Sequence, residues 1–371
     1  MKVVIILPTY NERENIGVLL DRLHQQVKKM ASHDIEFLVV DDNSPDDTAK
    51  VVEKYTKKSK KVFIISGKKD GLGKALLRGM KYAIANLKAD YIVQMDADLS
   101  HDPKVIPKMI SCLSNSSDMA VGSRYIPGGS IPANWGIHRK IYSIFGNAIV
   151  RYGLGCPKIH DWTGGFRGYK KKVAQAIIPN MGLYNGYLFQ IAFLHHATKL
   201  GIEITEVPIH FTDRQYGRSK IVFSEYIYKI LEYIIKTRIE KLMKGPFKKF
   251  LVVGTIGFII NTFLLEVFVS LGFHPSLSTA IGAECAIVSN FILNNYWTFS
   301  SHQISGIRQI VKFLQFNTTS LGALIIQAVS VWIGTYYMGV STYRIWYIIG
   351  VGIGLIWNYT MYSRIIWKTH K

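Results

Sequence analysis

Four long apolar segments occupy the C-terminal third of this 371-residue chain. They run over residues 250–273, 276–299, 310–338 and 343–367, and the only acidic residues in them are Glu266 and Glu284. Each segment approaches or exceeds the ~20 apolar residues that a helix needs to cross the hydrocarbon core of a bilayer. A soluble helical core rarely contains four consecutive segments of this length. The sequence therefore predicts an all-α domain with four transmembrane helices.

Basic residues flank the ends of these segments unequally. The connections at 272–275 and 339–342 contain no Lys or Arg, whereas the opposite ends carry several. The basic residues at those ends are Lys248, Lys249, Arg308, Lys312, Arg364, Lys368 and Lys371. The positive-inside rule therefore predicts an integral membrane protein with both termini in the cytoplasm. The N-terminal sequence agrees, because its first apolar run is too short for a signal peptide and leads directly into a turn.

The N-terminal part of the chain alternates strand patterns with helical patterns. Apolar runs at 3–7, 37–40, 62–65 and 91–95 each lead into turn-forming residues and then into a helical pattern. Repeated strand–helix units predict an α/β domain with a doubly wound, mainly parallel sheet. Ligands of such sheets bind outside the carboxyl ends of the strands.

Two carboxylates stand directly after the strand pattern at 91–95. Asp96 and Asp98 are two residues apart, so in extended backbone their side chains face the same side at the edge of the sheet. Paired hard oxygen ligands suit Mg²⁺ or Mn²⁺ carrying phosphate groups. The pattern therefore predicts a divalent metal site for a phosphorylated substrate.

Two common nucleotide-binding motifs are excluded. The stretch 67–74 is not a P-loop, because five residues separate Gly67 from Gly73, and Ala75 stands where Ser or Thr would hold Mg²⁺. The turn after the first strand, residues 8–12, contains no glycine for a pyrophosphate to approach. A dehydrogenase is therefore disfavoured.

The region between 129 and 246 is strongly basic and contains two amphipathic patterns. It contributes much of the net charge of +20, which arises from 45 Lys+Arg against 25 Asp+Glu. The apolar positions are Ile137, Ile141, Ile144, Phe145, Ala148, Ile149 and Tyr152 in the first pattern and Ile227, Ile230, Leu231 and Ile234 in the second. Both are typical of helices lying in a membrane interface, with packing against the sheet or each other as the alternative. Nucleic acid is disfavoured, because no recognisable binding signature accompanies the charge.

Several short motifs occur in order along the chain. They are Pro8-x-Tyr10-Asn11-Glu12, Val40-Asp41-Asp42-Asn43-Ser44, Gly71-Leu72-Gly73, Asp96-Ala97-Asp98-Leu99-Ser100-His101, Ser123-Arg124-Tyr125 and Thr163-Gly164-Gly165-Phe166-Arg167. Together they resemble family 2 glycosyltransferases of the GT-A fold, and more closely the dolichol-phosphate mannose synthases. The C-terminal part resembles the GtrA-like four-helix module fused to some members. The resemblance implies a GT-A domain at 1–220, an amphipathic interface helix or linker at 221–246 and a transmembrane domain at 247–371.

The resemblance also implies roles for individual residues. Asp42 would hydrogen-bond the guanine of the donor, and Asp96, Asp98 and Arg124 would form the catalytic group. The full set expected to bind the nucleotide sugar is Pro8, Tyr10, Glu12, Val40, Asp42, Asp96, Ala97, Asp98, Ser100 and Arg124. The metal ligands would be Asp96, Asp98 and Ser100. Ser100 stands where relatives often carry Gln, so a water in its place is the alternative third ligand.

A lipid phosphate approaching a diphosphate needs cations to offset the repulsion between the two anions. The best candidates in the sequence are Arg124, Arg139, Arg214 and Lys220. Arginine suits this role because its planar fork matches phosphate oxygens. The alternative is that these residues are solvated surface charges.

The leading hypothesis is an inverting mannosyl transfer from GDP-mannose to dolichyl or another polyprenyl phosphate at the cytosolic membrane face. The Gln-x-x-Arg-Trp motif of processive polysaccharide synthases is absent, which favours a single-sugar product. The Glu-Asp pair that supplies a general base in many inverting members is also absent, and a phosphate acceptor needs none. Two alternatives stay open: a UDP-glucose:polyprenyl-phosphate glucosyltransferase, and a non-catalytic flippase or scaffold for lipid-linked sugars.

Overall fold

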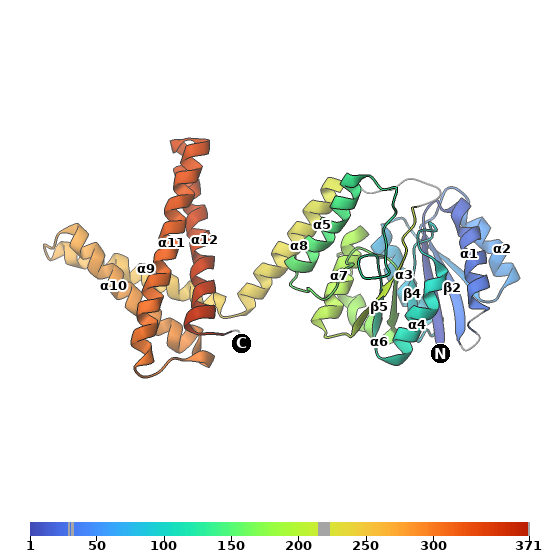
Figure 1. The fold of residues 1–371 in the computed structure, drawn as a ribbon, viewed down its shortest axis with the longest axis horizontal. Helices are drawn as coiled ribbons and strands as arrows, with labels where there is room; N and C mark the ends of the chain where they lie inside the picture. Colours follow the sequence, from blue (N-terminus) through green and yellow to red (C-terminus); the bar gives the residue numbers. More distant parts are fainter. Residues whose placement is uncertain (29, 31–32, 214–222, 370–371) are drawn as a thin grey trace. The chain divides into compact units, whose positions relative to one another are not determined.

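The computed structural model describes residues 1–28, 30, 33–213 and 223–369. The chain forms two compact units, Met1–Lys236 and Thr237–Lys371 (Figure 1). The boundary between these units falls inside 221–246, the stretch predicted to be an amphipathic linker. The finer domain limits stay predictions.

The first unit is built around a seven-stranded sheet with the order β3-β2-β1-β4-β6-β5-β7. The strands are β1 Lys2–Thr9, β2 Asp34–Asp41, β3 Val62–Ser66, β4 Tyr91–Gln94, β5 Met119–Ser123, β6 Arg167–Lys170 and β7 Ile204–Pro208. Neighbouring strands are parallel except for β6, which runs antiparallel to both β4 and β5. The predicted doubly wound, mainly parallel sheet is thereby confirmed.

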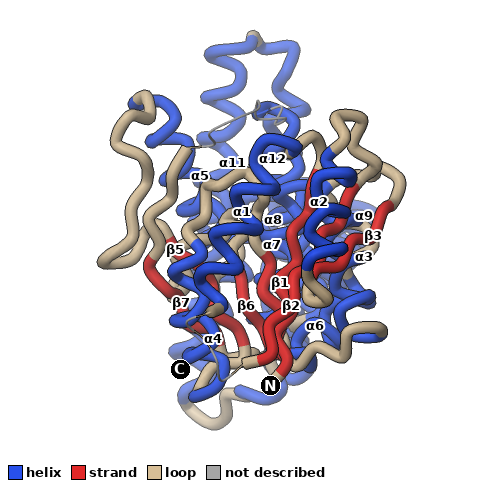
Figure 2. The backbone as a smooth tube through the Cα atoms, turned by 90° about the vertical axis from the view of Figure 1, so that its right-hand side faces the viewer, coloured by secondary structure: helices blue, strands red, loops and turns tan. Residues whose placement is uncertain are grey.

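Helices cover both faces of this sheet (Figure 2). Those that begin in the first unit are α1 Arg13–Val27, α2 Thr48–Lys58, α3 Leu72–Ala85, α4 Ile106–Asn115, α5 Ile137–Gly153, α6 Lys171–Ile177, α7 Gly186–Lys199 and α8 Phe223–Lys244. Side chains of β1 alternate between the two cores: Val4 and Ile6 pack with α3 and α7, whereas Ile5 packs with α1 and α4. All three are fully buried, and each such side chain contributes about 1.5–3 kcal/mol to stability.

Because β1, β2 and β4 are parallel neighbours, their carboxyl ends lie at one edge of the sheet. Thr9 at the end of β1 is in register with Asp41 at the end of β2, and Ile6 is in register with Gln94 at the end of β4. The residues that follow these strand ends are the predicted nucleotide and metal motifs. The topology therefore brings three separate sequence motifs to one edge.

The apolar face of α5 is exposed. Ile137 is 77% exposed and Phe145 is 62% exposed, whereas Asn147 and Val150 on the opposite side are buried. The other exposed apolar side chains of this helix are Ile141, Tyr142, Ile144, Ile149 and Tyr152. This face therefore does not pack against the sheet in the part of the chain that the structure describes. Its contact with a membrane stays a prediction.

The second amphipathic pattern, in α8, is divided between two environments. Ile230 and Ile234 are buried in the core of the first unit, and Ile234 lies against Gly153 of α5. Ile227 and Leu231 remain partly exposed, at 38% and 41%. Packing against neighbouring helices, the alternative left open for this pattern, therefore holds for half of its apolar positions.

The second unit consists of two helical hairpins. Its helices are α9 Phe247–Ser270, α10 Pro275–Leu293, α11 Arg308–Met338 and α12 Tyr343–Met361, and α10 and α12 each continue into a five-residue π-helix, Asn294–Thr298 and Tyr362–Ile366. Among the described residues, Phe247–Ser270, Arg308–Met338 and Val340–Ile366 are long and apolar enough to cross a membrane. The fourth expected span, α10 with its π-helix, is not among these three, so its crossing of a membrane stays a prediction. α10 packs along α9, with Gly257 against Asn290 and Gly282 against Asn261.

The hairpins meet in an aromatic cluster at their π-helical ends. Phe299 and Trp367, which follow the two π-helices, stack with ring centroids 4.6 Å apart and an interplanar angle of 17°.

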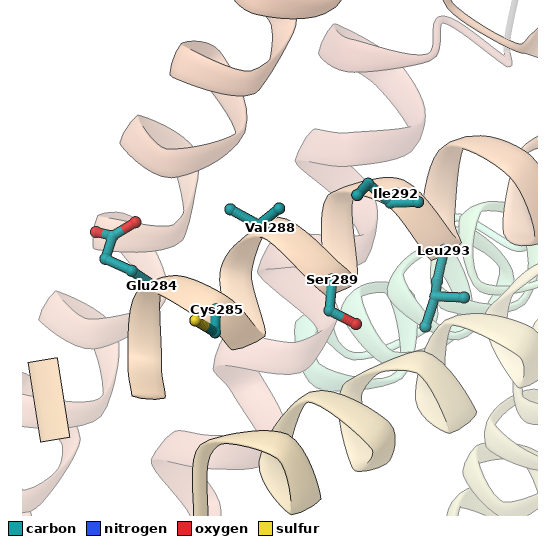
Figure 3. Close-up of a pocket in the computed structure, with 6 residues that line it drawn as sticks. All are labelled: Glu284, Cys285, Val288, Ser289, Ile292 and Leu293. Atoms are coloured by element: carbon teal, nitrogen blue, oxygen red, sulfur yellow. The ribbon is translucent and has the colours of Figure 1, made fainter. Parts of the chain in front are cut away.

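A separate shallow cavity of about 480 Å³ lies along α10 (Figure 3). It is lined by Glu284, Cys285, Val288, Ser289, Ile292 and Leu293. None of the predicted catalytic or nucleotide-binding residues lines this cavity.

Candidate active site

The loops after β1 and β2 are tied together by the buried carboxylate of Asp41. Asp41 Oδ1 accepts hydrogen bonds from Thr9 Oγ1 at 2.9 Å and from Ser44 Oγ at 2.6 Å. The Asn11 amide donates to Ser44 Oγ at 3.0 Å. Asn11 and Asn43 adopt positive φ values of 59° and 52°, a conformation that asparagine tolerates better than most residues. The first two predicted motifs therefore form one rigid platform.

Three of the predicted nucleotide-binding residues lie at the end of β1 or directly after it. Pro8 is half-buried at the end of β1, and the Tyr10 ring lies 3.8 Å from the ammonium of Lys69. Glu12 is buried, its amide donates to Thr48 Oγ1 at 3.0 Å, and its carboxylate accepts from Asn15 Nδ2 at 2.7 Å. These contacts fix Glu12 against α1 and α2, and its contact with a nucleotide stays a prediction.

Asp42 forms an ion pair with Arg78 of α3, whose Nη2 lies 2.5 Å from Asp42 Oδ1. Burial raises the pKa of Asp42, and the hydrogen bond and charge of Arg78 oppose that effect. Gly67 leaves room for the pair, because a Cβ at that position would overlap the Arg78 guanidinium. Arg78 was not predicted from the sequence. Its only signal was a basic residue on the helix that follows Gly71-Leu72-Gly73.

Asp96 and Asp98 follow β4, as predicted. The Asp96 side chain is 36% exposed, whereas Asp98 is nearly buried. Asp98 Oδ1 accepts hydrogen bonds from the amide of Ser100 at 3.1 Å and from its hydroxyl at 2.6 Å. Ser100 is itself buried, so the structure places it in support of Asp98. A direct bond from Ser100 to a metal stays a prediction.

His101 supports Asp96 from behind. Its ring is buried, stacks on Phe166 with centroids 5.0 Å apart and accepts a hydrogen bond at Nδ1 from the Asp96 amide at 3.3 Å. Burial lowers the pKa of His101 to about 4, with the charge of Arg124 contributing, although Asp98 and Asp161 oppose the shift. The imidazole is therefore neutral near pH 7. It can accept the hydrogen bond from the Asp96 amide, but it carries no positive charge that could bind an anionic substrate.

Glycine makes room for the exposed carboxylate. A Cβ at Gly165 would lie 3.0 Å from Asp96 Oδ1, closer than ordinary packing allows, so the open space beside Asp96 depends on this residue. Gln94 fixes the glycine segment by donating from Nε2 to the Gly165 carbonyl at 3.1 Å. Beneath it lies Arg167, which is fully buried and donates to the backbone carbonyls of Gln190 and Trp162. The predicted Thr163–Arg167 motif is thus the floor of the site.

Arg124 is held by a bidentate ion pair with Asp161. Arg124 Nε lies 2.7 Å from Asp161 Oδ2, Nη2 lies 2.8 Å from Oδ1, and Nη2 also donates to Thr163 Oγ1 at 2.7 Å. Burial alone would raise the pKa of the fully buried Asp161, but Arg124 and backbone amides outweigh it and hold that pKa below its usual value. Asp161 was not predicted from the sequence, although it stands two residues before the Thr163–Arg167 motif.

Arg139 lies at the first turn of α5 and is 52% exposed. Its Nη1 is 3.1 Å from Asp213 Oδ1, and its guanidinium lies 3.9 Å from the centroid of the Trp135 ring.

Two other cations proposed for the acceptor phosphate, Arg214 and Lys220, lie outside the described residues. Val40 and Ala97 are buried, so a contact from either residue to a nucleotide stays a prediction.

The residues near the end of β4 offer carboxylate oxygens as ligands for a divalent metal ion. In the described part of the chain, no three His, Cys, Asp or Glu side chains converge on one point. The protein therefore offers the carboxylates of Asp96 and Asp98, and diphosphate oxygens and water would complete the shell, as is usual for Mg²⁺ bound with phosphates. The exposed Asp96 carboxylate beside Gly165 is the feature that fits such an ion.

Comparison with known proteins agrees with this arrangement. Residues 4–178 match glycosyl transferase family 2, and residues 249–367 match the GtrA/DPMS transmembrane domain. The dolichol-phosphate mannosyltransferase of Pyrococcus furiosus is 32% identical and covers 100% of both chains. Polyprenol monophosphomannose synthase of Mycolicibacterium smegmatis is 36% identical over 65% of this chain and 89% of its own length. The chain therefore belongs to glycosyl transferase family 2, within the dolichol-phosphate mannosyltransferases that carry a GtrA/DPMS transmembrane domain.

Proposed function

We propose that this polyprenyl-phosphate mannosyltransferase takes mannose from GDP-mannose and transfers it to dolichyl or another polyprenyl phosphate, inverting the anomeric carbon. The observation that carries the proposal is the arrangement of Asp96 and Asp98 beside the Arg124–Asp161 pair at one edge of the sheet. Carboxylates there suit a metal-bound diphosphate, and a guanidinium suits a phosphate. The relatives named for mannosyl transfer to a polyprenyl phosphate support the same reaction.

The proposed acceptor agrees with the lack of a Glu-Asp pair in the sequence, because a phosphate acceptor needs no general base. A phosphate monoester has a second pKa of about 6 and is already an anionic nucleophile near pH 7. The imidazole nearest to Asp96, His101, is buried and engaged by the Asp96 amide. Catalysis would then consist mainly of holding donor and acceptor in line and stabilising developing charge.

Each residue would contribute to that positioning. Asp42 and Arg78 would orient the base, the loop of Tyr10 and Glu12 would enclose the nucleoside, and Asp96 and Asp98 would hold Mg²⁺ or Mn²⁺. A bound ion would supply Lewis-acid stabilisation of the departing diphosphate. Arg124 would face the acceptor phosphate while Asp161 fixes its orientation. With the positive-inside rule, this reaction would occur at the cytosolic membrane face.

A UDP-glucose enzyme remains the second candidate, because the pair of Asp42 and Arg78 fits more than one base. A carboxylate acceptor beside a guanidinium donor matches N1–H and O6 of guanine, but it also matches N3–H and O4 of uracil. The choice of GDP-mannose therefore rests on the mannosyltransferase relatives. The intact pair of Asp96 and Asp98 argues against a non-catalytic flippase or scaffold.

Transfer assays with the full chain and a polyprenyl phosphate test the proposal. We expect labelled mannose from GDP-mannose to enter the lipid fraction, EDTA to stop this transfer, and Mn²⁺ or Mg²⁺ to restore it. Labelled UDP-glucose should give little product. Preferential glucosyl transfer would establish the second candidate, and the absence of transfer from either donor would support a binding protein.

Replacing Arg78 should weaken nucleotide binding. Arg78→Met removes the charge-assisted hydrogen bond to Asp42 and leaves a buried carboxylate without that donor. We expect GDP affinity to fall about tenfold in calorimetry. Lys81→Met is a matched control, because Lys81 is exposed on the same helix. Equal GDP affinities of the two variants would show that Arg78 does not contribute to nucleotide binding.

A further inference from the structure

The two arginines proposed for the acceptor side are held in the same way, each by one carboxylate and aromatic rings. Arg124 pairs with Asp161, and its guanidinium carbon lies 5.3 Å from the centroid of Phe211. Arg139 pairs with Asp213 and lies against Trp135. The repeated arrangement suggests that the orientation of both guanidinium groups matters.

The arrangement of Arg139 with Asp213 and Trp135 is unexpected, because the Arg139 side chain is half exposed. An exposed arginine ordinarily samples many rotamers, and ordering it costs conformational entropy. Here the Trp135 indole N–H donates to Asp213 Oδ1 at 2.7 Å, and Arg139 Nη1 lies 3.1 Å from the same oxygen. Trp135 is itself only 7% exposed, so it provides a fixed surface. The guanidinium of Arg139 is thereby held on two sides.

Phe211 connects this arrangement to the catalytic residues. Its ring centroid lies 6.0 Å from that of Trp135 and 5.7 Å from that of His101, both edge to face. His101 in turn accepts the hydrogen bond from the Asp96 amide. Contacting side chains therefore run from Arg139 to the strand end that carries the metal-binding carboxylates. The position of Arg139 is set relative to those carboxylates.

The place of Arg139 on α5 suits a lipid phosphate. It lies within the first turn of α5, beside an exposed apolar face that begins with Ile137 and continues with Ile141 and Ile144. A polyprenyl phosphate has a long apolar chain and one anionic end. The fixed guanidinium of Arg139 matches the anionic end, and the apolar face of α5 matches the apolar chain.

We propose that Trp135 and Asp213 are positioning residues that orient Arg139 toward the acceptor phosphate. They act through Arg139 and do not touch the donor. By holding the guanidinium in advance, they lower the entropy cost of binding the lipid phosphate. This inference rests on the proposed mannosyl transfer to a polyprenyl phosphate.

Two substitutions in the full chain separate the contributions of Asp213 and Trp135. Asp213→Asn keeps an oxygen that can accept from Trp135 but removes the charge that holds Arg139, and Trp135→Phe removes the indole donor while retaining a ring. We expect Asp213→Asn to raise the KM for polyprenyl phosphate about tenfold, the effect of losing one charge-assisted hydrogen bond. Trp135→Phe should raise it less. The KM for GDP-mannose and the calorimetric Kd for GDP should stay within about twofold of wild type.

A double-mutant comparison decides whether Asp213 acts through Arg139. If it does, Asp213→Asn should raise the acceptor KM no further in an Arg139→Ala background. Asp118→Asn is the matched control, because Asp118 forms surface ion pairs with Lys170 and Lys172. Thermal unfolding of every variant identifies any general loss of structure.

Several outcomes would overturn the inference. They are an unchanged acceptor KM in Asp213→Asn, additive effects in the double mutant, or an equal loss of GDP affinity. In each of these cases the wild-type chain would still transfer mannose, so the proposed function would stand. If the wild-type chain transfers no mannose to the lipid, the proposed function itself fails, and the inference fails with it.

Discussion

Replacing either carboxylate of the Asp96–Asp98 pair with its amide is expected to lower kcat/KM for mannosyl transfer about a thousandfold. Asp96→Asn and Asp98→Asn keep the size of the side chains but remove the charges that fit a divalent ion. Without those charges, the negative charge that develops on the departing diphosphate is poorly stabilised. The measurement is transfer of labelled mannose by the full chain at saturating Mn²⁺.

We expect smaller losses of transfer when Ser100 or Asp102, the polar residues next to the carboxylate pair, is replaced. Ser100 lies behind Asp98 and donates to it, so Ser100→Ala should cost about tenfold or less, the effect of one hydrogen bond. Asp102→Asn is the control, since Asp102 accepts a hydrogen bond from the Lys104 amide at a helix start, where asparagine serves equally well. A loss with Ser100→Ala as large as that with Asp98→Asn would instead make Ser100 a metal ligand.

Metal binding offers a readout that does not depend on turnover. We expect paramagnetic resonance to detect Mn²⁺ bound to the wild-type chain with GDP, and EDTA to remove that signal. Asp96→Asn should weaken the signal, because the Asp96 side chain is the more exposed of the two carboxylates. Mn²⁺ binding of wild-type strength in both amide variants would contradict the assignment, whatever their activity.

The sequence predicted the elements with strong periodic patterns and the motifs at their ends. The runs that became β1, β2 and β4 contain long apolar stretches, so their burial and order could be inferred. The antiparallel strand β6, Arg167–Lys170, could not, because four residues with charged ends carry little periodicity. Its pairing between β4 and β5 depends on contacts between distant parts of the chain.

Partners of the site residues were harder to predict than the residues themselves. Arg78 is 36 positions from Asp42, and Asp161 is 37 positions from Arg124. Such pairs form because the strand order brings loops together, and local sequence does not record that order. The same limit applies to the second amphipathic pattern. Ile230 packs in a core and Ile227 is partly exposed, yet both are simply apolar positions in the sequence.

Arg124→Lys is the second substitution for which we expect a large effect. Lysine keeps the positive charge but cannot form the two parallel hydrogen bonds that Asp161 receives from the guanidinium. We expect mannosyl transfer to fall about a hundredfold, with GDP affinity within about threefold of wild type. Comparing transfer rates with calorimetric GDP binding separates loss of acceptor positioning from loss of the donor pocket.

The same variant should change the response of the protein to acid. The pKa of Asp161 is lowered in the folded chain, because Arg124 outweighs the effect of burial. The carboxylate therefore contributes stability that is fully present above its ordinary pKa and is lost as the pH falls below about 4. In Arg124→Lys the compensating charge is held less closely, so the pKa of Asp161 should be lowered less and the amount of stability lost in acid should be smaller. Thermal unfolding of both proteins between pH 3 and pH 7 measures the difference.

These two measurements distinguish a catalytic arginine from a structural one. If Arg124 serves only to neutralise the buried Asp161, the lysine variant should lose less stability in acid than wild type but transfer mannose at the wild-type rate. If it also contacts the acceptor phosphate, transfer should fall even at pH 7, where the folded protein is stable. The direct hydrogen bond from Arg124 to Thr163, two residues before the Gly165 that borders Asp96, favours the second result.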